Sequence, residues 1–262
     1  MRKKGYAVIT GASAGIGECF AKRLAKEGYP LVLVARRKER LEQLAMTLTK
    51  KYHITVKVIV CDVSKVEECY RLMGEIKDLN LSIFINNAGF GDCGAFERAD
   101  LSKELNMIDV NVKAVQILTK LALKQMQKRK KGYILNVASS AGLIPAGPYM
   151  STYYATKAYV ASMTQAITEE LRQAKSPIYV GCLCPGPVET EFNAVANAEF
   201  TLKGISASYC ANYAIDKMFA RKTVIIPTYY MKLAVIFGRF LPRKLYVRIV
   251  GMQQKRKLEK KL

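Results

Sequence analysis

The stretch VITGASAGIGE, residues 8–18, decides the fold of this chain. An apolar β-branched run ends at Thr10, three glycines follow at spacing G-x-x-x-G-x-G, and a helical pattern begins at Ile16. Glycine allows a tight turn and a close backbone approach, and the free N–H groups of a helix N-terminus attract phosphate. The stretch therefore predicts a strand, a turn that binds a dinucleotide pyrophosphate, and a helix. The predicted contacts are Gly11, Ser13, Gly15, Ile16 and Gly17. The generic fingerprint is G-x-G-x-x-G, so a glycine turn needed only for packing remains the alternative.

Beyond this stretch, short β-branched runs alternate with longer segments of helical period, which is typical of a parallel sheet covered by helices on both faces. We predict strands at Tyr6–Thr10, Leu31–Ala35, Thr55–Cys61, Ser82–Asn86, Tyr133–Val137, Ile178–Cys184 and Thr223–Ile226. We predict helices at Ile16–Glu27, Arg37–Lys51, Val66–Lys77, Leu105–Arg129 and Thr152–Ala174. The fold class is α/β: one Rossmann-like, doubly wound parallel sheet of seven strands. Its ligand is expected beyond the carboxyl ends of the strands. Residues 1–228 are predicted to form one domain, and 229–262 a basic helical tail.

The composition is that of a globular protein, with 262 residues of which 50% are hydrophobic. The seven cysteines are irregularly spaced, and Cys182 and Cys184 have no matching second pair. We therefore expect no metal site, and free thiols in a reducing cytoplasm. The apolar stretch after the basic N-terminus is too short for a signal peptide, and no apolar run is long enough to cross a bilayer.

Basic residues follow the second predicted strand, where a dinucleotide site presents an acid to the ribose 2′-OH of NAD or an arginine to the 2′-phosphate of NADP. This chain has Arg36 and Arg37 there, and no carboxylate before Glu39. The sign of the charge predicts NADP(H) in preference to NAD(H). The alternative is a solvated basic surface, since the net charge is +21.

A second informative stretch, MSTYYATKAYV at 150–160, places Tyr153 and Lys157 on one face of a helix. Together with the glycine turn, it resembles the short-chain dehydrogenase/reductase family. The resemblance runs from about Gly5 to Thr190, and more loosely to about Pro227. It rests on an ordered set of motifs: TGASAGIG at 10–17, CDV at 61–63, NNAG at 86–89, Asn111, Ser139, YYATK at 153–157 and PGPVET at 185–190.

The resemblance implies catalytic roles for Asn111, Ser139, Tyr153 and Lys157. Lys157, with the positive ring of the oxidised cofactor, would lower the pKa of the Tyr153 phenol, while hydrogen-bonding the nicotinamide ribose. Tyr153 would protonate a carbonyl oxygen as hydride arrives, or take the proton from an alcohol in reverse. Ser139 would orient that oxygen, and Asn111 would hold a water that links Lys157 to solvent.

Two of these residues have a competing neighbour. Tyr154 also lies near the Lys157 face, but the family pattern Tyr-x-Ala-Ser/Thr-Lys favours Tyr153 and leaves Tyr154 to pack. Ser140 precedes Tyr153 by thirteen residues, the usual family spacing, whereas Ser139 precedes it by fourteen. The strand register favours Ser139, with one additional residue in the loop, and Ser140 remains the alternative.

The same resemblance implies further cofactor contacts. Asp62 and Val63 would contact the adenine, the Asn86–Gly89 turn would flank the cofactor and brace the central strands, and the segment 185–190 would run along the nicotinamide carboxamide. In these two segments the predicted contacts are Asn87, Ala88, Gly89, Pro185, Gly186, Val188 and Thr190. The prolines and glycines of 185–190 could instead form only a rigid turn.

Residues 189–210 occupy the position of the family's substrate lid. The lid has no cluster of charge suited to a sugar phosphate or a dicarboxylate, and its apolar residues predict a pocket for a ketone or aldehyde on a lipid, steroid or acyl chain. These residues are Phe192, Val195, Phe200, Leu202 and Ile205. They could equally belong to the core.

The tail departs furthest from a typical family member. From Lys232 to Leu262 there are ten Lys and Arg residues and one Glu, which predicts two basic amphipathic helices separated at Pro242. The tail could lie on an anionic membrane surface, or pack on its own domain or a partner subunit. Nucleic acid is not expected, because no recognition motif accompanies the charge.

The sequence therefore predicts an NADP(H)-dependent oxidoreductase that interconverts a ketone or aldehyde and an alcohol. We expect a cytoplasmic homodimer or homotetramer, peripheral at a membrane if the tail binds lipid. The competing hypothesis is a cofactor-binding or membrane-associated scaffold protein without turnover. It is disfavoured because the chain keeps the tyrosine, lysine, serine and asparagine together.

Overall fold

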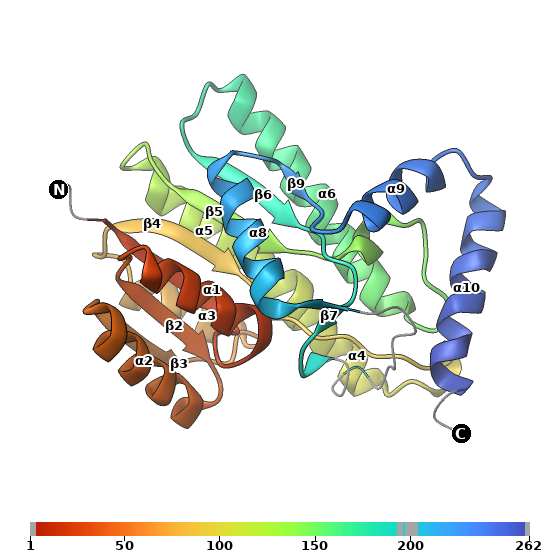
Figure 1. Cartoon of the computed structure of the whole chain (residues 1–262), viewed down its shortest axis with the longest axis horizontal. Coiled ribbons are helices and arrows are strands. Elements are labelled where there is room, and N and C mark those ends of the chain that lie inside the picture. The colour runs from red at the N-terminus through yellow and green to blue at the C-terminus, as the bar shows by residue number, and fades with distance from the viewer. Residues whose placement is uncertain (1–3, 193–195, 197–203, 260–262) are drawn as a thin grey trace.

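A seven-stranded parallel sheet between two layers of helices organises the computed structural model, which describes residues 4–192, 196 and 204–259 (Figure 1). The strand order is β3-β2-β1-β4-β5-β6-β9, and each neighbouring pair is parallel. The strands are β1 (Tyr6–Thr10), β2 (Leu31–Ala35), β3 (Val56–Val60), β4 (Leu81–Asn86), β5 (Tyr133–Val137), β6 (Tyr179–Leu183) and β9 (Val224–Ile225). The predicted doubly wound fold is confirmed, and every predicted strand lies within one residue of the observed bounds.

The helices cover both faces of this sheet. They are α1 (Gly15–Lys26), α2 (Lys38–Tyr52), α3 (Val66–Glu75), α4 (Leu101–Ile108), α5 (Val115–Gln127), α6 (Ser151–Gln173), α8 (Ala207–Phe219), α9 (Tyr229–Gly238) and α10 (Arg243–Glu259). Short 3-10 turns lie at Phe96–Arg98 and Ser140–Leu143, and a π-helical segment at Asp109–Ala114. A separate two-stranded ladder pairs β7 (Val188–Glu189) with β8 (Ile205–Ser206).

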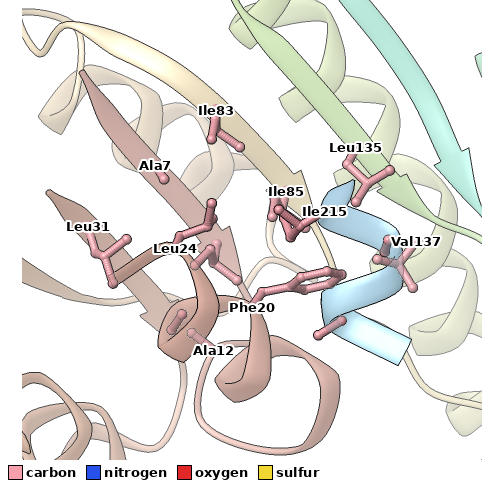
Figure 2. Close-up of a cluster of buried hydrophobic side chains, with 14 of the residues drawn as sticks. Ala7, Ala12, Phe20, Leu24, Leu31, Ile83, Ile85, Leu135, Val137 and Ile215 are labelled. Carbon is pink, nitrogen blue, oxygen red and sulfur yellow. The ribbon is translucent and has the colours of Figure 1, made fainter. Parts of the chain in front are cut away.

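The core on one face lies between the sheet and helices α1, α2 and α8. Phe20 and Leu24 of α1 and Ile215 of α8 point toward the strand residues Ile85 and Leu135 in Figure 2, and all five are fully buried. The opposite face packs against α3, α5 and α6. Since strands buried on both faces need apolar residues at every position, this explains why they appear in the sequence as continuous β-branched runs.

The structure differs from the predicted elements in three places. The single helix predicted at Leu105–Arg129 is instead α4, the π segment and α5, and α4 begins at Leu101 because the Asp100 side chain accepts a hydrogen bond from the Ser102 N–H at 2.9 Å. Helix α8 was not predicted, and neither was the ladder of β7 and β8. The start of α8 is capped by Ser206, whose hydroxyl accepts from the Tyr209 N–H at 3.1 Å.

The predicted basic tail forms two helices separated near Pro242, as the sequence indicated. Helix α9 ends at Gly238 and α10 begins at Arg243, and both lie at the right-hand end of the molecule in Figure 1. No helix among the described residues is long and apolar enough to cross a membrane.

The start of α1 yields a test of packing at the first turn. A Cβ on Gly17 would lie 2.2 Å from the Gly11 carbonyl oxygen and 2.5 Å from Asn87 Nδ2, whereas a Cβ on Gly74 of α3 would meet nothing within 4 Å. We expect Gly17→Ala to lower the free energy of unfolding by about 1–3 kcal/mol, because backbone atoms must move to admit the methyl group. Gly74→Ala should cause no loss, since alanine favours a helix. Urea unfolding measures both, and equal stabilities of the two variants would contradict this packing.

Candidate active site

A cavity of about 1160 Å³ opens at the carboxyl ends of the strands, where a doubly wound sheet binds its ligand. It is lined by the turns after β1 and β4, the ends of β2, β3 and β5, the start of α6, the segment after β6, and the two tail helices. The predicted cofactor residues all lie on its wall except Gly17, and the predicted catalytic residues all do except Asn111.

The turn after β1 is fastened to the turn after β4. The side-chain amide of Asn87 donates to the carbonyls of Thr10 and Gly11 at 2.9 and 3.2 Å. In return, the Thr10 hydroxyl accepts from the backbone N–H groups of Asn87 and Ala88, both at 3.0 Å. These four bonds fix the glycine turn against the centre of the sheet.

The glycine turn itself leaves the backbone open to the cavity. Gly11 and Gly15 have φ angles of +65° and +57°, in the left-handed region that favours glycine. Ala14 precedes α1 in extended conformation and provides no side-chain cap. The first N–H groups of α1 therefore remain available to an anion at the cavity wall.

Arg36 and Arg37 stand at the cavity wall after β2. The Arg37 guanidinium donates to the Ser13 hydroxyl at 3.1 Å and to Glu191 at 2.9 Å, and Arg40 contacts the other oxygen of Glu191 at 2.6 Å. Hydrogen bonds from Arg40 and Arg37 hold the pKa of Glu191 below its ordinary value. Glu191 was not predicted as a site residue. The only sequence feature that could have indicated it is its position, as the acidic residue directly after the segment 185–190.

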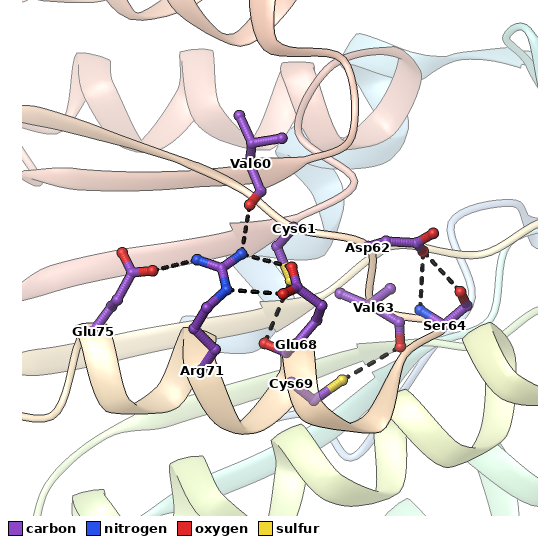
Figure 3. Close-up of polar contacts among 9 residues, drawn as sticks. All are labelled: Val60, Cys61, Asp62, Val63, Ser64, Glu68, Cys69, Arg71 and Glu75. Carbon is purple, nitrogen blue, oxygen red and sulfur yellow. Dashed lines mark hydrogen bonds and ion pairs between the residues drawn. The ribbon is translucent and has the colours of Figure 1, made fainter.

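The loop after β3 is held in place by its own polar contacts (Figure 3). The Asp62 carboxylate accepts from the Ser64 N–H and hydroxyl at 3.1 and 2.9 Å, and the Cys69 thiol donates to the Val63 carbonyl at 3.3 Å. Arg71 links the carbonyl of the last residue of β3 to two glutamates of α3. Asp62 and Val63 thus reach the cavity from an anchored loop.

Ser139, Tyr153 and Lys157 come together at the buried end of the cavity. Their exposed fractions are 8%, 9% and 4%. The Tyr153 phenol is hydrogen-bonded to the Ser139 hydroxyl. The Lys157 ammonium lies 5.9 Å from the centre of the Tyr153 ring and donates to the Val137 carbonyl at 2.9 Å. The Ser140 N–H donates to the Pro185 carbonyl at 2.8 Å.

Burial displaces the pKa values of this group. It raises the pKa of Tyr153 to about 12, against the opposing hydrogen bond from Ser139, and lowers the pKa of Lys157 to about 8. The lowered tyrosine pKa expected from the sequence applies to the complex with the oxidised cofactor. In the protein alone, loss of hydration penalises the phenolate more than the nearby groups stabilise it.

Tyr154 points away from this group toward the tail. Its hydroxyl accepts a hydrogen bond of 2.7 Å from the Gln254 side chain of α10, and its ring meets that of Tyr153 edge-on at 6.3 Å. Burial raises the pKa of Tyr154. Tyr154 therefore connects the helix that carries Tyr153 to the last helix of the chain.

Asn111 lies fully buried in the π segment, behind the cavity wall. Its amide exchanges hydrogen bonds with the backbone of Phe90, at 3.1 and 2.9 Å, and donates to the Thr156 hydroxyl at 3.1 Å. A Cβ on Gly89 would lie 2.9 Å from Asn111 Oδ1 and 3.2 Å from Lys157 Nζ, so both polar groups border the space that the absent Gly89 side chain leaves free.

The wall beyond Tyr153 is apolar. Of the predicted lid residues, Phe192 lies 5.5 Å from the Tyr153 ring and Ile205 packs on the core, whereas Val195, Phe200 and Leu202 lie outside the described residues. Helices α9 and α10 of the tail complete this wall. Their contribution to the cavity was not predicted from the sequence. Its lining residues are Tyr230, Met231, Ala234, Phe237, Gly238, Leu241, Tyr246, Ile249, Val250, Gln253 and Gln254.

Comparison with known proteins identifies the family. Residues 5–200 match the family model described as short chain dehydrogenase. The chain belongs to the short-chain dehydrogenase family. The chain is 34% identical over 200 residues to the very-long-chain 3-oxoacyl-CoA reductase of Anas platyrhynchos, and 34% identical over 188 residues to hydroxysteroid dehydrogenase-like protein 1 of Gallus gallus. The alignments cover 74% and 71% of this chain but 63% and 56% of those proteins, so the chain spans less than two thirds of their length.

Solved structures agree with this placement. A short-chain dehydrogenase from Sphingobium yanoikuyae in complex with NADPH has a TM-score of 0.82 and 29% identity, over 90% of this chain and 93% of that one. A short-chain dehydrogenase/reductase from Burkholderia phymatum in complex with NAD has a TM-score of 0.81 and 25% identity, over 90% and 93% of the two chains. Since the two relatives hold different dinucleotides, they do not decide the cofactor preference of this one.

A nicotinamide dinucleotide fits the residues of this chain. The open glycine turn and the uncapped N-terminus of α1 suit a pyrophosphate, and Asp62, Val63 and Lys157 line the same cavity. The predicted site residues other than Gly17 and Asn111 thus surround one continuous space.

The buried Lys157 ammonium should make the stability of this chain rise with pH. Its folded pKa of about 8 lies below the ordinary value near ~10.4, so between these pH values the unfolded chain binds more protons. From pH 7 to pH 10 this contribution to the free energy of unfolding should increase by about 2 kcal/mol. The Lys157→Met variant should not show this increase in the free energy of unfolding.

The readout is the difference in urea unfolding between wild type and variant at the two pH values, because the other titrating groups are common to both proteins. Lys120→Met, at an exposed position of α5, is the matched control and should follow the wild-type pH dependence. An unchanged difference between Lys157→Met and wild type would show that Lys157 is fully charged in the fold at pH 10.

Proposed function

We propose that this chain is an NADP(H)-dependent oxidoreductase that interconverts a ketone or aldehyde and an alcohol by hydride transfer, with Tyr153 as the acid and base. The observation that carries the proposal is the hydrogen-bonded pair of Ser139 and Tyr153, with Lys157 beside it, at the wall of a cavity that fits a dinucleotide. The family membership and the names of the relatives support it.

The nicotinamide cofactor, when bound, supplies or accepts the hydride, and the residues of the chain manage the proton. Ser139 and Tyr153 both hydrogen-bond the carbonyl oxygen, and Tyr153 donates its proton as negative charge develops there. Lys157, with a pKa of about 8, is close to its titration point near neutral pH and so can return a proton to the phenol. The lowering of the tyrosine pKa expected from the sequence depends on the positive ring of the oxidised cofactor, and so belongs to the complex.

Asn111 supports Lys157 in this scheme. Its amide is fixed by the backbone of Phe90, and its Oδ1 and the Lys157 ammonium border the same space beside Gly89. We propose that it holds a water through which Lys157 exchanges protons with solvent. Apart from this water, the burial of Ser139, Tyr153 and Lys157 excludes water from the reacting oxygen.

The substrate is proposed to be apolar: a lipid, a steroid or an acyl chain that carries the carbonyl. The cavity wall beyond Tyr153 is formed by Phe192 and by the apolar side chains of α9 and α10. The relatives named as a 3-oxoacyl-CoA reductase and a hydroxysteroid dehydrogenase-like protein fit the same class.

The two adjacent tyrosines provide the test of the mechanism. Tyr153→Phe should lower kcat at least about 100-fold while NADPH binding stays nearly unchanged, because only the proton donor is lost. Tyr154→Phe removes the hydroxyl next to it and should retain substantial activity. The measurement is NADPH absorbance with a panel of apolar ketones and alcohols, together with NADPH titration by fluorescence.

Two outcomes would contradict the proposal. An inactive Tyr154→Phe with an active Tyr153→Phe would reverse the assignment of the two tyrosines. An intact chain that binds cofactor but converts no ketone, aldehyde or alcohol would favour the scaffold protein without turnover.

The preference for NADP(H) is proposed from the charge at the end of β2. Arg36 is exposed at the cavity wall, and Arg37 stands beside it but is engaged by Glu191. A 2′-phosphate would meet two cations there, whereas the 2′-OH of NAD has no carboxylate partner between Ala35 and Lys38.

NADPH should therefore bind more tightly than NADH, and Arg36→Ala should lower the ratio of the NADH and NADPH dissociation constants by about tenfold to a hundredfold. Glu191→Gln should raise this ratio, because the variant releases Arg37 from its carboxylate partner. Dissociation constants measured by fluorescence titration decide this. Equal values for NADPH and NADH in the unmodified chain would refute the preference.

We also propose a cytoplasmic location and a homodimer or homotetramer. All seven cysteines are free thiols, as expected in a reducing compartment. A peripheral contact of the tail with anionic membranes completes the proposal. It is supported by the basic charge of the tail and by the exposed aromatic residues of α9 and of the turn that follows it.

A further inference from the structure

The corner between α9 and α10 exposes an apolar surface. Four large apolar side chains lie there within nine positions of the chain, and we call them the corner patch. They are Phe237, Phe240, Leu241 and Leu245, with exposed fractions of 63%, 82%, 39% and 45%. The two helices are packed together at this corner, since the Tyr246 hydroxyl donates to the Ala234 carbonyl at 3.4 Å and a Cβ on Gly238 would lie 2.4 Å from the Tyr246 ring. A water-exposed surface of this kind marks a site of interaction.

Positive charge surrounds the corner patch. Arg239, Arg243, Lys244 and Arg248 are exposed, and none of the four is paired with a carboxylate in the described structure. No Asp or Glu occurs from residue 229 to residue 255. Aromatic and aliphatic side chains bordered by unpaired cations match an anionic lipid surface, where the former enter the interface and the latter meet headgroups.

The corner patch is continuous with the substrate cavity. Tyr230, Ala234, Phe237 and Leu241 recur at the spacing of one helix face, all four line the cavity, and all four are also exposed. Ile249 and Val250 of α10 also line the cavity. Two residues of the corner patch, Phe237 and Leu241, therefore belong to the cavity wall as well.

A second copy of the chain fits this surface less well than lipid does. Symmetric dimers join the same patch on both partners, which would bring the four cations of one copy against the four of the other. Like charges at an interface oppose association, whereas an anionic lipid surface neutralises them.

We propose that the corner patch docks on an anionic lipid surface, and that apolar carbonyl substrates enter the cavity from the lipid between α9 and α10. The entry route rests on the proposed reductase function, whereas the docking does not. Substrate that moves along this path exchanges the apolar interior of the membrane for the apolar wall of the cavity without crossing water.

Phe240→Glu tests the docking. Phe240 is the most exposed residue of the patch and does not line the cavity, so the variant should fold and keep its activity on a small water-soluble ketone. Met46→Glu, on exposed α2 at the opposite end of the molecule, is the matched control (Figure 1). Binding is measured by co-sedimentation with phosphatidylcholine vesicles that contain or lack phosphatidylserine.

The intact chain and Met46→Glu should bind the phosphatidylserine vesicles at low salt and release them at high salt, and Phe240→Glu should bind at least tenfold more weakly. Arg243→Ala and Lys244→Ala should each weaken binding about fivefold. Failure of the intact chain to bind at low salt would overturn the proposal. So would a stable oligomer that Phe240→Glu dissociates, because the patch would then be a subunit contact.

The entry route is tested with a long-chain ketone dissolved in the vesicles. Phe240→Glu should turn it over at least tenfold more slowly than the intact chain and Met46→Glu, with equal rates on the soluble ketone. Equal rates on the vesicle-borne ketone would overturn the route. An intact chain that binds vesicles but reduces no carbonyl compound would refute the proposed function while the docking stands.

Discussion

The hydrogen bonds between the turn after β1 and the turn after β4 set the geometry on which the rest of this protein depends. Asn87 holds the backbone of Thr10 and Gly11, and the helix α1 can start so close to them only because residue 17 has no side chain. The residue before Asn87 makes a similar contact. Asn86, at the end of β4, donates from its side-chain amide to Asn136 of the adjacent strand β5 at 2.9 Å, so residues 86–87 also brace β5. The glycine turn and the strand that leads to Ser139 are therefore positioned by one pair of adjacent asparagines.

The regular part of the fold could be predicted because its signals are local. Strands buried on both faces need uninterrupted β-branched runs, and such runs end where a polar or turn residue begins. The interruption of the fourth helix could not be found in this way, because the π segment at Asp109–Ala114 leaves the apolar pattern on either side intact. Helix α8 was missed although Ser206 is a good cap, since the residues before it had been assigned to the lid.

The same distinction between local and long-range signals applies to the candidate site. Residues inside short motifs, such as Tyr153 and Lys157, were predicted from the family pattern Tyr-x-Ala-Ser/Thr-Lys. Glu191 and the lining of the cavity by α9 and α10 depend on contacts between distant positions: Gln254 meets Tyr154 across 100 residues of chain. The raised pKa of the Tyr153 phenol has a related origin. The number of neighbours that bury a phenol is a property of the packed structure, whereas the sequence shows only which charges are near it.

The hydrogen bond between Tyr154 and Gln254 has a consequence for how this fold can evolve. Two adjacent residues of one helix have different partners: Tyr153 is hydrogen-bonded to Ser139, and Tyr154 anchors the helix that lines the cavity. Changes in α10 can therefore reshape the cavity while Ser139, Tyr153 and Lys157 stay in place. A lineage that exchanged only its last helix would acquire a new cavity on an inherited Rossmann-like sheet.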